Sequence, residues 1–399
     1  MNHKALYRLT GQIQHYRWGG YDFIPQLLHI VNAGHQSFAE YWLGAHDNAP
    51  AQIIPGNIPL NIYLQEHLQE NGAAGISKRL PYLLKVLDVR DMLSIQVHPS
   101  KQAAAVEFER ENAGGIPLTA SHRNYKDDNH KPELMVALSD FWLLHGFKPV
   151  EEIIEIIETV PEFAFMLPLL KEGGYKQLYS KLMQMEQEEI NRILQPLLER
   201  IVAAYDCDYL PKESPHFWAA RAALTFNEPD KTDRGIFSIY LLNLVHLDIG
   251  EAIFQDAGVL HAYLEGQNIE IMANSDNVLR GGLTPKHIDV NELMKHVTFE
   301  AVTPRVIQAT DAGNGEQVFA SPAPDFRLSR FVLKKEQKLA IATSSTEIYL
   351  LLEGAVTLKQ GDTTLELNTG DAAVSFGNSG LEMAALSPAI LYRACSGGI

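Results

Sequence analysis

The hydrophobic periodicity of this 399-residue chain changes twice, and those changes limit the folds open to it. From residue 1 to about residue 147, short apolar runs are broken by Gly, Pro, Asn and Asp, as in β-strands joined by turns. Between residues 149 and 226, apolar residues recur at helical spacing. From Ile236 the strand-like pattern returns, and Ile239–Leu247 is apolar enough for a buried strand. The sequence therefore predicts a mainly β protein with a helical insertion.

Two helix starts can be placed within this pattern. Ser100 is expected to cap a helix that runs from Lys101 to about Asn112. Pro149 and the acidic residues that follow it suit the first turn of the helical region, because they complement the helix dipole. We expect the apolar stripes of this region to pack in the core rather than to bind a partner.

A short pattern occurs twice in the second β region. Gly250–Phe254 and Gly370–Val374 both begin with a glycine and an acidic residue, and a leucine lies three positions before each glycine. His261 follows the first copy, whereas its counterpart in the second copy is Leu381. Short strands around repeated turns of this kind suggest jelly-roll β-barrels, with chance similarity as the alternative.

Composition excludes several classes of function. The chain has 33 Lys and Arg against 49 Asp and Glu, a formal net charge of −16. An acidic surface repels phosphate backbones and anionic lipid, so neither nucleic-acid nor membrane binding is expected. The two cysteines cannot make a disulfide framework, and the N-terminus lacks the apolar segment of a signal peptide. We expect a cytoplasmic protein without a membrane span.

Three polar clusters stand out from the strand pattern. In the first, Ser94, Gln96 and His98 alternate with apolar residues, so they project from one strand face. Pro99 favours an extended backbone at His98 and preserves that geometry. A strand with one apolar and one polar face suits a ligand-lined sheet interior.

The second cluster surrounds Pro132, which holds Lys131 extended. Lys131 and Glu133 should therefore share a face, with His130 on the opposite side. A cation beside a carboxylate can be an exposed ion pair that contributes little to the free energy of folding. The alternative is a metal-bound carboxylate beside a charged group of a substrate.

The third cluster combines ring and basic side chains. His261 and Tyr263 share a strand face if the strand is regular. Arg280 and Lys286 flank a Gly/Thr/Pro turn, so both can converge on a phosphate.

Two imidazoles, a carboxylate and a carboxamide oxygen from these clusters would suit zinc, although iron, manganese or cobalt also fit such donors. An open coordination position would let the metal act as a Lewis acid on a substrate oxygen. The competing interpretation is three polar strands whose side chains satisfy one another. The residues alone leave both interpretations open.

The strings of residues around these clusters resemble one known family. They resemble the type I mannose-6-phosphate isomerase (phosphomannose isomerase) family, in family order from about residue 16 to 290. The matching strings are Tyr16–Gly19, Ala39–His46, Leu80–Leu87, Leu93–Pro99, Asn129–Glu133, His261–Tyr263, Ser275–Arg280 and Thr284–Lys286.

The resemblance implies two cupin (jelly-roll) domains with an all-α insertion. Residues 1–148 with 227–310 would form the catalytic cupin domain, and residues 149–226 the helical insertion. Residues 311–399 would form a degenerate cupin-like domain, which agrees with the repeat that lacks its histidine.

The resemblance also implies a reaction and a cofactor. The reaction would interconvert mannose 6-phosphate and fructose 6-phosphate by proton transfer through a cis-enediol. One Zn²⁺ per chain would be bound by Gln96, His98, Glu133 and His261. Arg280 falls at the family's catalytic arginine. The expected partner is a small sugar phosphate, and the chain is expected to be a monomer.

Other roles are assigned less directly. Lys131 is favoured as the catalytic base, and Arg280 would stabilise the enediolate or grip phosphate. Further candidates for the base or for substrate contacts are Ser94, His130, Tyr263, Glu270, Asp276 and Lys286. Packing for Tyr263, a structural carboxylate for Glu270 and turn capping for Asp276 are the alternatives. A non-catalytic cupin sensor of sugar phosphates and another metal-dependent cupin enzyme are the alternative functions.

Overall fold

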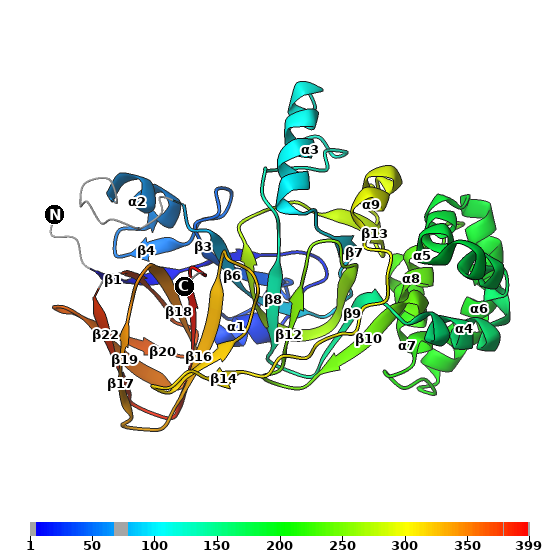
Figure 1. Cartoon of the computed structure of the whole chain (residues 1–399). Coiled ribbons are helices and arrows are strands. Elements are labelled where there is room, and N and C mark those ends of the chain that lie inside the picture. Colours follow the sequence, from blue (N-terminus) through cyan, green and yellow to red (C-terminus); the bar gives the residue numbers. More distant parts are fainter. Residues whose placement is uncertain (1–4, 68–78, 378, 398–399) are drawn as a thin grey trace.

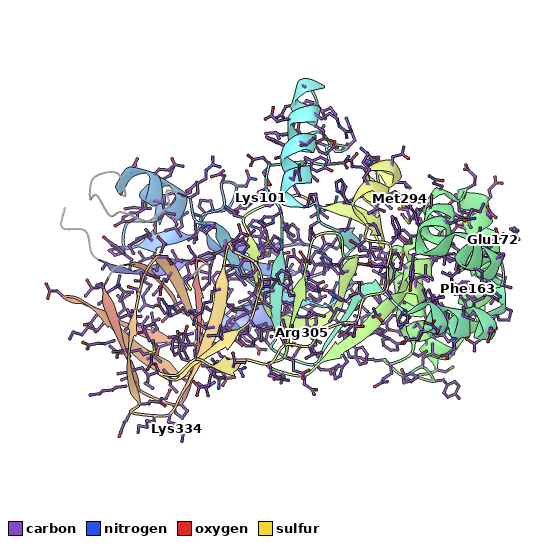
Figure 2. The ribbon with its side chains drawn as sticks, in the orientation of Figure 1. Lys101, Phe163, Glu172, Met294, Arg305 and Lys334 are labelled. Carbon is purple, nitrogen blue, oxygen red and sulfur yellow. The ribbon has the colours of Figure 1, made fainter. Side chains whose placement is uncertain are left out.

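The computed structural model describes residues 5–67, 79–377 and 379–397. As the periodicity predicted, the chain is mainly β, with its helices gathered largely at one end (Figure 1). Strands of the C-terminal region occupy the other end, and the strands that carry the predicted site lie between them. In Figure 2, Phe163 lies within the helical end and Lys334 lies at the opposite end.

The middle of the molecule is an antiparallel network of strands built around one long strand, β12. This strand pairs with β6, β7, β8 and β9, so it brings segments distant in sequence to one surface. The strands of this sheet are β2 (Gln12–Gln14), β3 (Glu40–Gly44), β6 (Tyr82–Val89), β7 (Ile95–Val97), β8 (Glu133–Ala137), β9 (Phe141–Phe147), β10 (Leu242–Leu247), β11 (Ala252–Gln255), β12 (His261–Ala273) and β13 (Leu279–Gly282).

Helices fill residues 150–226, as predicted. They are α4 (Val150–Thr159), the 3-10 turn η1 (Pro161–Phe163), α5 (Met166–Gln184), α6 (Gln187–Asp206) and α7 (Pro215–Phe226). The apolar stripe of α6 is buried, and it packs in one core with β7 and β13. The prediction that this stripe belongs to the core is confirmed, and the helical end is continuous with the sheet through apolar contacts.

The strand predicted over Ile239–Leu247 is only half correct. Helix α8 (Gly235–Leu241) takes the first part of this run, and β10 begins at Leu242. Every residue of α8 is buried. A segment surrounded by protein needs apolar residues on all sides, so its sequence carries no periodicity that separates helix from strand.

Four helices lie outside the helical end in the described part of the chain. They are α1 (Phe23–Leu27), α2 (Leu60–His67), α3 (Lys101–Ala113) and α9 (Val290–His296). Helix α3 projects from the body (Figure 1), and its predicted cap is confirmed, since Ser100 Oγ accepts the Ala103 N–H at 3.3 Å. Within the described segments, no helix is both long and apolar enough to cross a membrane.

The C-terminal strands form two sheets. One sheet has the order β14-β15-β16-β23-β18-β21-β1-β4-β5 and the other β17-β22-β19-β20. Strand β1 pairs with β21, so sheet pairing crosses the predicted boundary between the catalytic and C-terminal domains. The strands are β1 (Leu6–Thr10), β4 (Gln52–Ile54), β5 (Ile58–Pro59), β14 (Thr310–Asp311), β15 (Glu316–Phe319), β16 (Arg327–Leu333), β17 (Lys338–Ala342), β18 (Thr346–Glu353), β19 (Ala355–Gln360), β20 (Thr363–Asn368), β21 (Ala372–Phe376), β22 (Gly380–Ala385) and β23 (Ala389–Cys395).

The two copies of the Gly-acid pattern have the same local structure. Gly250 and Gly370 both have positive φ, 87° and 85°, at the turn before β11 and before β21. In each copy the next carboxylate accepts the backbone N–H of the residue three positions earlier, at 2.9 and 2.8 Å. The repeat in the sequence therefore encodes a repeated turn.

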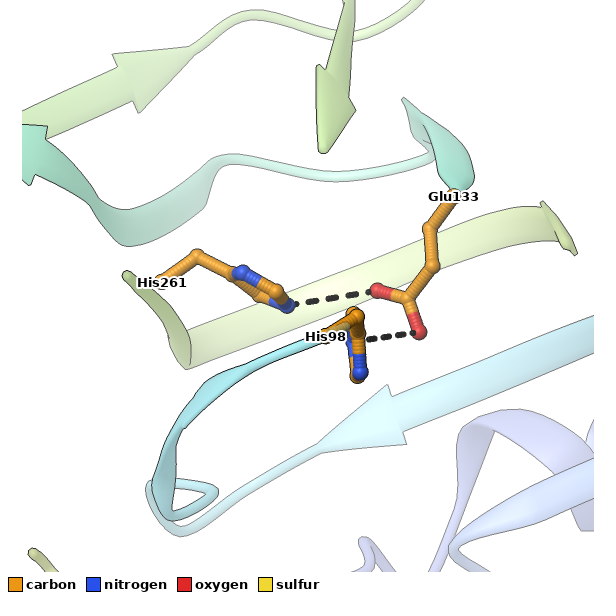
Figure 3. Close-up of side chains that lie close together, drawn as sticks. All are labelled: His98, Glu133 and His261. Carbon is orange, nitrogen blue, oxygen red and sulfur yellow. Dashed lines mark ion pairs between the residues drawn. The ribbon is translucent and has the colours of Figure 1, made fainter. Parts of the chain in front are cut away.

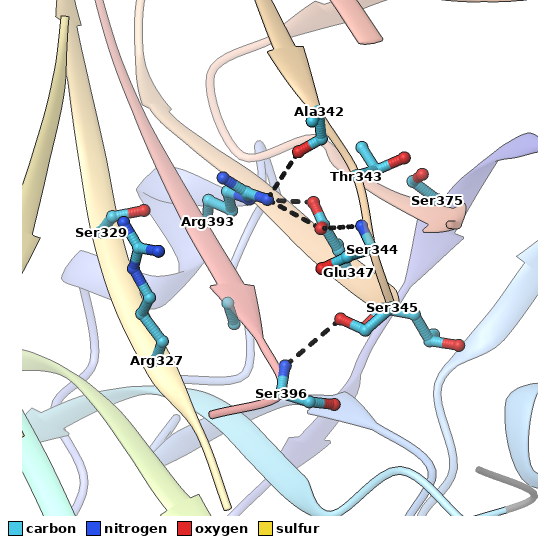
Figure 4. Close-up of polar contacts among 12 residues, drawn as sticks. Arg327, Ser329, Ala342, Thr343, Ser344, Ser345, Glu347, Ser375, Arg393 and Ser396 are labelled. Atoms are coloured by element: carbon cyan, nitrogen blue, oxygen red, sulfur yellow. Dashed lines mark hydrogen bonds and ion pairs between the residues drawn. The ribbon is translucent and has the colours of Figure 1, made fainter. Parts of the chain in front are cut away.

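A buried ion pair occupies the interior of the C-terminal strands (Figure 4). Arg393 donates to both oxygens of Glu347, at 2.7 and 2.8 Å, and also to Glu316 and the Ala342 carbonyl, both at 3.1 Å. These bonds satisfy the charge within the protein, so we assign this cluster to the stability of the C-terminal region.

Candidate metal centre

Three of the four predicted zinc ligands meet in the middle sheet. One potential ligand atom from each of His98, Glu133 and His261 lies within 4.8 Å of the other two (Figure 3). His98 follows β7, Glu133 begins β8 and His261 begins β12, and all three side chains are buried. In the described part of the chain, this is the only such group of His, Cys, Asp and Glu residues.

Backbone carbonyls fix how the two imidazoles point. His98 Nδ1 donates to the Asn277 carbonyl at 2.8 Å, and His261 Nδ1 donates to the Val259 carbonyl at 2.9 Å. A carbonyl can only accept, so each Nδ1 carries the hydrogen and each Nε2 has a free lone pair. Both Nε2 atoms lie 3.4 Å from the Glu133 carboxylate.

Three buried atoms at this point have no hydrogen-bond partner within the described residues: His98 Nε2, His261 Nε2 and Glu133 Oε2. Buried polar atoms without partners are uncommon, because each costs desolvation free energy. An imidazole nitrogen pair and a carboxylate oxygen that converge in this way are donors for a divalent metal ion. The geometry therefore favours the metal site over self-satisfied polar strands.

The electrostatics keep these groups in the protonation states that bind a metal. Burial, together with the nearby Lys131 ammonium, lowers the pKa of His98 to about 4. Burial alone would raise the pKa of Glu133, but Lys131 and His98 hold it well below its usual range. A neutral His98 and an ionised Glu133 are the forms that coordinate metals.

The strand register places the other predicted site residues beside the triad. Gln96 is paired with His261 on one side and with Arg280 on the other. Directly opposed residues of antiparallel strands point to the same face, so these three side chains share a surface. A bulge at Gly281 follows Arg280 in β13. Ser94 is half-buried and immediately precedes β7.

The alternation predicted around Pro132 is confirmed. Lys131 Nζ donates to Glu133 Oε1, and both side chains are buried. His130 points the other way and bonds through Nε2 to Asp325 at 2.8 Å, which connects it to the C-terminal region. Lys131 is therefore the one of these two that lies against the triad.

A buried charged group next to the triad was missed by the sequence analysis. Lys85 Nζ lies 3.1 Å from Glu270 and 3.6 Å from Glu40, and the Tyr263 hydroxyl donates to Glu270 at 2.9 Å. Lys85 also lies over the ring of Trp42, at 5.1 Å. The available signal was a lysine inside the otherwise apolar run of β6.

Asp276 does not act as the turn cap that the alternative interpretation proposed. Its Oδ2 bonds to His46 Nε2 at 3.1 Å, while its own N–H donates to Asp127 Oδ2 at 2.7 Å. Asp127 also accepts from the Ser275 hydroxyl. Asp127 therefore organises this turn, and the sequence analysis did not single it out.

Three cations gather around the end of β13. Within the described residues, the Arg280 guanidinium makes no hydrogen bond or ion pair, and burial lowers its pKa. Burial and repulsion from Arg280 lower the pKa of Lys286. The pKa of Lys126 is also lowered, first by burial and then by repulsion from Arg123 and Arg280. Glu40 counteracts the shift at Lys286, and Glu111 and Asp276 counteract that at Lys126, but among the described residues none of them forms an ion pair with these cations. Cations without a direct ion pair suit an anionic ligand.

Comparison with known proteins gives one consistent result. Residues 6–150 match the family described as "Phosphomannose isomerase type I, catalytic domain". The mannose-6-phosphate isomerase of Salmonella typhimurium is 35% identical over 92% of this chain and 94% of its own. The human mannose-6-phosphate isomerase is 29% identical over 98% of both chains.

Solved structures agree with the sequence comparison. The Salmonella typhimurium mannose 6-phosphate isomerase bound to fructose 6-phosphate and zinc superposes with a TM-score of 0.87 and 33% identity, covering 99% of this chain and 100% of the other. The apo form of the same enzyme gives the same TM-score and coverage. With agreement over nearly the whole length, this chain belongs to the type I mannose-6-phosphate isomerase family.

Proposed function

We propose that this protein is a zinc-dependent isomerase that interconverts mannose 6-phosphate and fructose 6-phosphate. The observation that carries the proposal is the convergence of three buried donor atoms, from His98, Glu133 and His261, that have no hydrogen-bond partner among the described residues. The family relationship supplies the reaction, since a relative binds both zinc and fructose 6-phosphate.

The residues fit the metal that the family implies. His98, Glu133 and His261 would hold zinc, with Gln96 as a fourth ligand on the same face. When bound, zinc would polarise a substrate oxygen as a Lewis acid. The carbonyls that orient each Nδ1 preorganise the imidazoles for this role.

The isomerisation moves one proton between C2 and C1 of the open-chain sugar, and another between the two oxygens on these carbons. We assign the transfer of the carbon proton to Lys131, whose Nζ lies against Glu133 at the centre of the site. An ammonium group cannot accept a proton, so Lys131 would act as the neutral amine, after the proton that it carries beside Glu133 has passed to solvent. The other candidate bases are engaged elsewhere: Glu270 by Lys85 and Tyr263, and Asp276 by His46. A cis-enediol would form when the C2 proton leaves, and negative charge would develop on oxygen.

Positive charge for the substrate comes from the end of β13. Arg280 and Lys286 would bind the anionic groups of the sugar phosphate, with Ser94 as a neighbouring contact. Lys126 adds a third cation, although its Nζ already donates to the Leu118 carbonyl at 2.8 Å. A local concentration of cations lets a protein with a net negative charge bind an anion.

We propose a cupin architecture for both sheet regions, with the helical segment inserted between strands β9 and β10. The repeated Gly-acid turn supports this proposal, because both copies precede a strand at the same position of the pattern. Strand β1 pairs with β21, which indicates that the two regions are joined by a common sheet and not only by a flexible linker.

The test is conversion of mannose 6-phosphate to fructose 6-phosphate by purified protein, before chelation, after chelation and after zinc is restored. We expect loss and recovery of turnover. His98→Ala should abolish both turnover and zinc binding, whereas His122→Ala, at an exposed histidine, should change neither. Zinc-loaded, folded protein without turnover would refute the enzyme and favour a sensor of sugar phosphates.

A further inference from the structure

We propose that Asp233 is a positioning residue for substrate binding, because its carboxylate holds the turn that joins Arg280, in β13, to Lys286. Asp233 lies between α7 and α8, on the segment that leads from the helices back to the sheet. The inference rests on the proposed function in one respect: it takes Arg280 and Lys286 as the cations that bind the anionic substrate.

The carboxylate of Asp233 accepts three backbone N–H groups. Its Oδ1 accepts from Leu283 at 2.8 Å and from Gly235 at 2.7 Å, and its Oδ2 accepts from Thr284 at 3.0 Å. Two of these donors belong to the turn after β13, and the third belongs to the start of α8. Hydrogen bonds to an ionised carboxylate are stronger than those between neutral groups, so the two segments are joined by a strong contact.

The turn needs such a contact because its backbone is strained. Leu283 has a φ of 52°, in the left-handed region that a residue with a branched side chain rarely adopts. Gly282, with a φ of 128°, precedes it and ends β13. Conformations of this kind persist only when the surroundings impose them.

Close packing adds to the hydrogen bonds on the same side. A Cβ atom at Gly282 would lie only 2.4 Å from the Gly235 Cα, so the two backbones are in direct contact. A Cβ at Gly281 would lie 2.9 Å from the Tyr179 hydroxyl of α5. The helical region therefore supports the turn along its length, while pairing with β7 ends at Gly282.

The two cations lie on either side of the supported residues. Arg280 precedes Leu283 by three residues, and Lys286 follows Thr284 by two. Within the described segments neither cation has an ion-pair partner that could fix it in place. The pairing of β13 with β7 places Arg280, and the backbone of the turn, which Asp233 holds in its strained form, then places the Cα of Lys286 relative to it.

The test compares Asp233→Asn with Asp230→Asn, a matched control. Both substitutions remove one carboxylate from the same loop, but the Asp230 side chain is exposed. Asparagine at 233 keeps one accepting oxygen and presents an NH₂ group to the Thr284 N–H. Loss of one charge-assisted bond should raise KM for mannose 6-phosphate about 10-fold, with a smaller change in kcat.

Two binding measurements separate positioning from other roles. The Kd of inorganic phosphate for the zinc-loaded protein, by calorimetry, should rise by the same factor as KM in Asp233→Asn. The affinity for zinc should not change, because Asp233 contacts none of the triad. If KM and phosphate Kd match those of the control, or if zinc affinity falls instead, the inference is wrong.

A measurement on the native protein covers the case in which the variant does not fold. Hydrogen exchange of the amides of Leu283 and Thr284 should be slow before phosphate is added, and phosphate should add little protection. Fast exchange in the absence of phosphate would overturn the inference. Phosphate binding needs no turnover, so a wild-type protein that fails to isomerise mannose 6-phosphate would refute the proposed reaction and leave this comparison intact.

Discussion

Replacing Lys85 with methionine should strongly destabilise the protein. Lys85 Nζ lies 3.1 Å from Glu270 and 3.6 Å from Glu40, and less than a tenth of each side chain is exposed. Methionine fills most of the lysine volume, so the main effect is two buried carboxylates without their cation. Removal of one partner from a buried ion pair costs about 3–5 kcal/mol.

The pKa shifts indicate how this cost should depend on pH. Burial alone would lower the pKa of Lys85, but Glu40 and Glu270 raise it, so the lysine stays charged. Burial, followed by repulsion from Glu133, raises the pKa of Glu270 even with Lys85 present. A carboxyl group with a raised folded pKa favours folding below its unfolded pKa and loses that benefit as pH rises through the folded pKa. The variant should therefore regain stability as the pH is lowered.

The assay is thermal unfolding of zinc-free protein over a range of pH. At about 2 °C per kcal/mol for a large domain, Lys85→Met should lower Tm by about 6 °C or more at neutral pH. The double variant Lys85→Met/Glu270→Gln should recover part of that loss. Lys171→Met, at an exposed lysine, is the matched control. Equal Tm values for Lys85→Met and the control would refute the reasoning.

Three further outcomes follow from the structure. Burial lowers the pKa of His145 to about 4, and its Nδ1 donates to Gln255 at 2.7 Å. The neutral His145 side chain should contribute its full stabilisation above the unfolded-state pKa of about 6.5, and up to about 3 kcal/mol of this should be lost as the pH drops toward 4. In His145→Leu, Tm should therefore fall less steeply with decreasing pH than in the control His122→Leu. Zinc added to chelated protein should raise Tm, because at a free zinc concentration one hundred times Kd it adds about 2.7 kcal/mol to the free energy of unfolding. His98→Ala should abolish this shift in Tm. Ser100→Ala should cost about 1 kcal/mol, seen as faster amide exchange at the start of α3, and unchanged exchange would show that the cap contributes nothing.

Local sequence was sufficient for those parts of the site that lie within one strand. The face shared by Lys131 and Glu133 followed from two-residue alternation, and the opposite direction of His130 followed with it. The alternation of side chains along one strand does not predict which residues from distant parts of the sequence will contact them. The contacts of Lys85 with Glu40 and Glu270 join three strands, so only the assembled sheet reveals them.

Among the helices too, those with a local sequence pattern could be predicted, and those defined by distant contacts could not. The helices of region 149–226, with the clear apolar stripe of α6, were predicted correctly. Helix α8 is buried on every side, and its last part was mistaken for a strand. The role of Asp233 lies outside any local pattern, because its donors Leu283 and Thr284 are fifty residues further along the chain.

One irregularity of β12 changes which of its side chains share a face. Strict alternation would place Tyr263 and Glu270, seven residues apart, on opposite faces of the sheet. A bulge between Tyr263 and Glu265 shifts the register, and the Tyr263 hydroxyl reaches Glu270 at 2.9 Å. Gly266 follows the bulge with a φ of 123°, and a Cβ there would lie 2.6 Å from the Asp140 carbonyl. The bulge thus brings Tyr263, from the first part of β12, to the same face as Glu270 and its partner Lys85, so the buried charges lie on the side of the sheet that Tyr263 occupies.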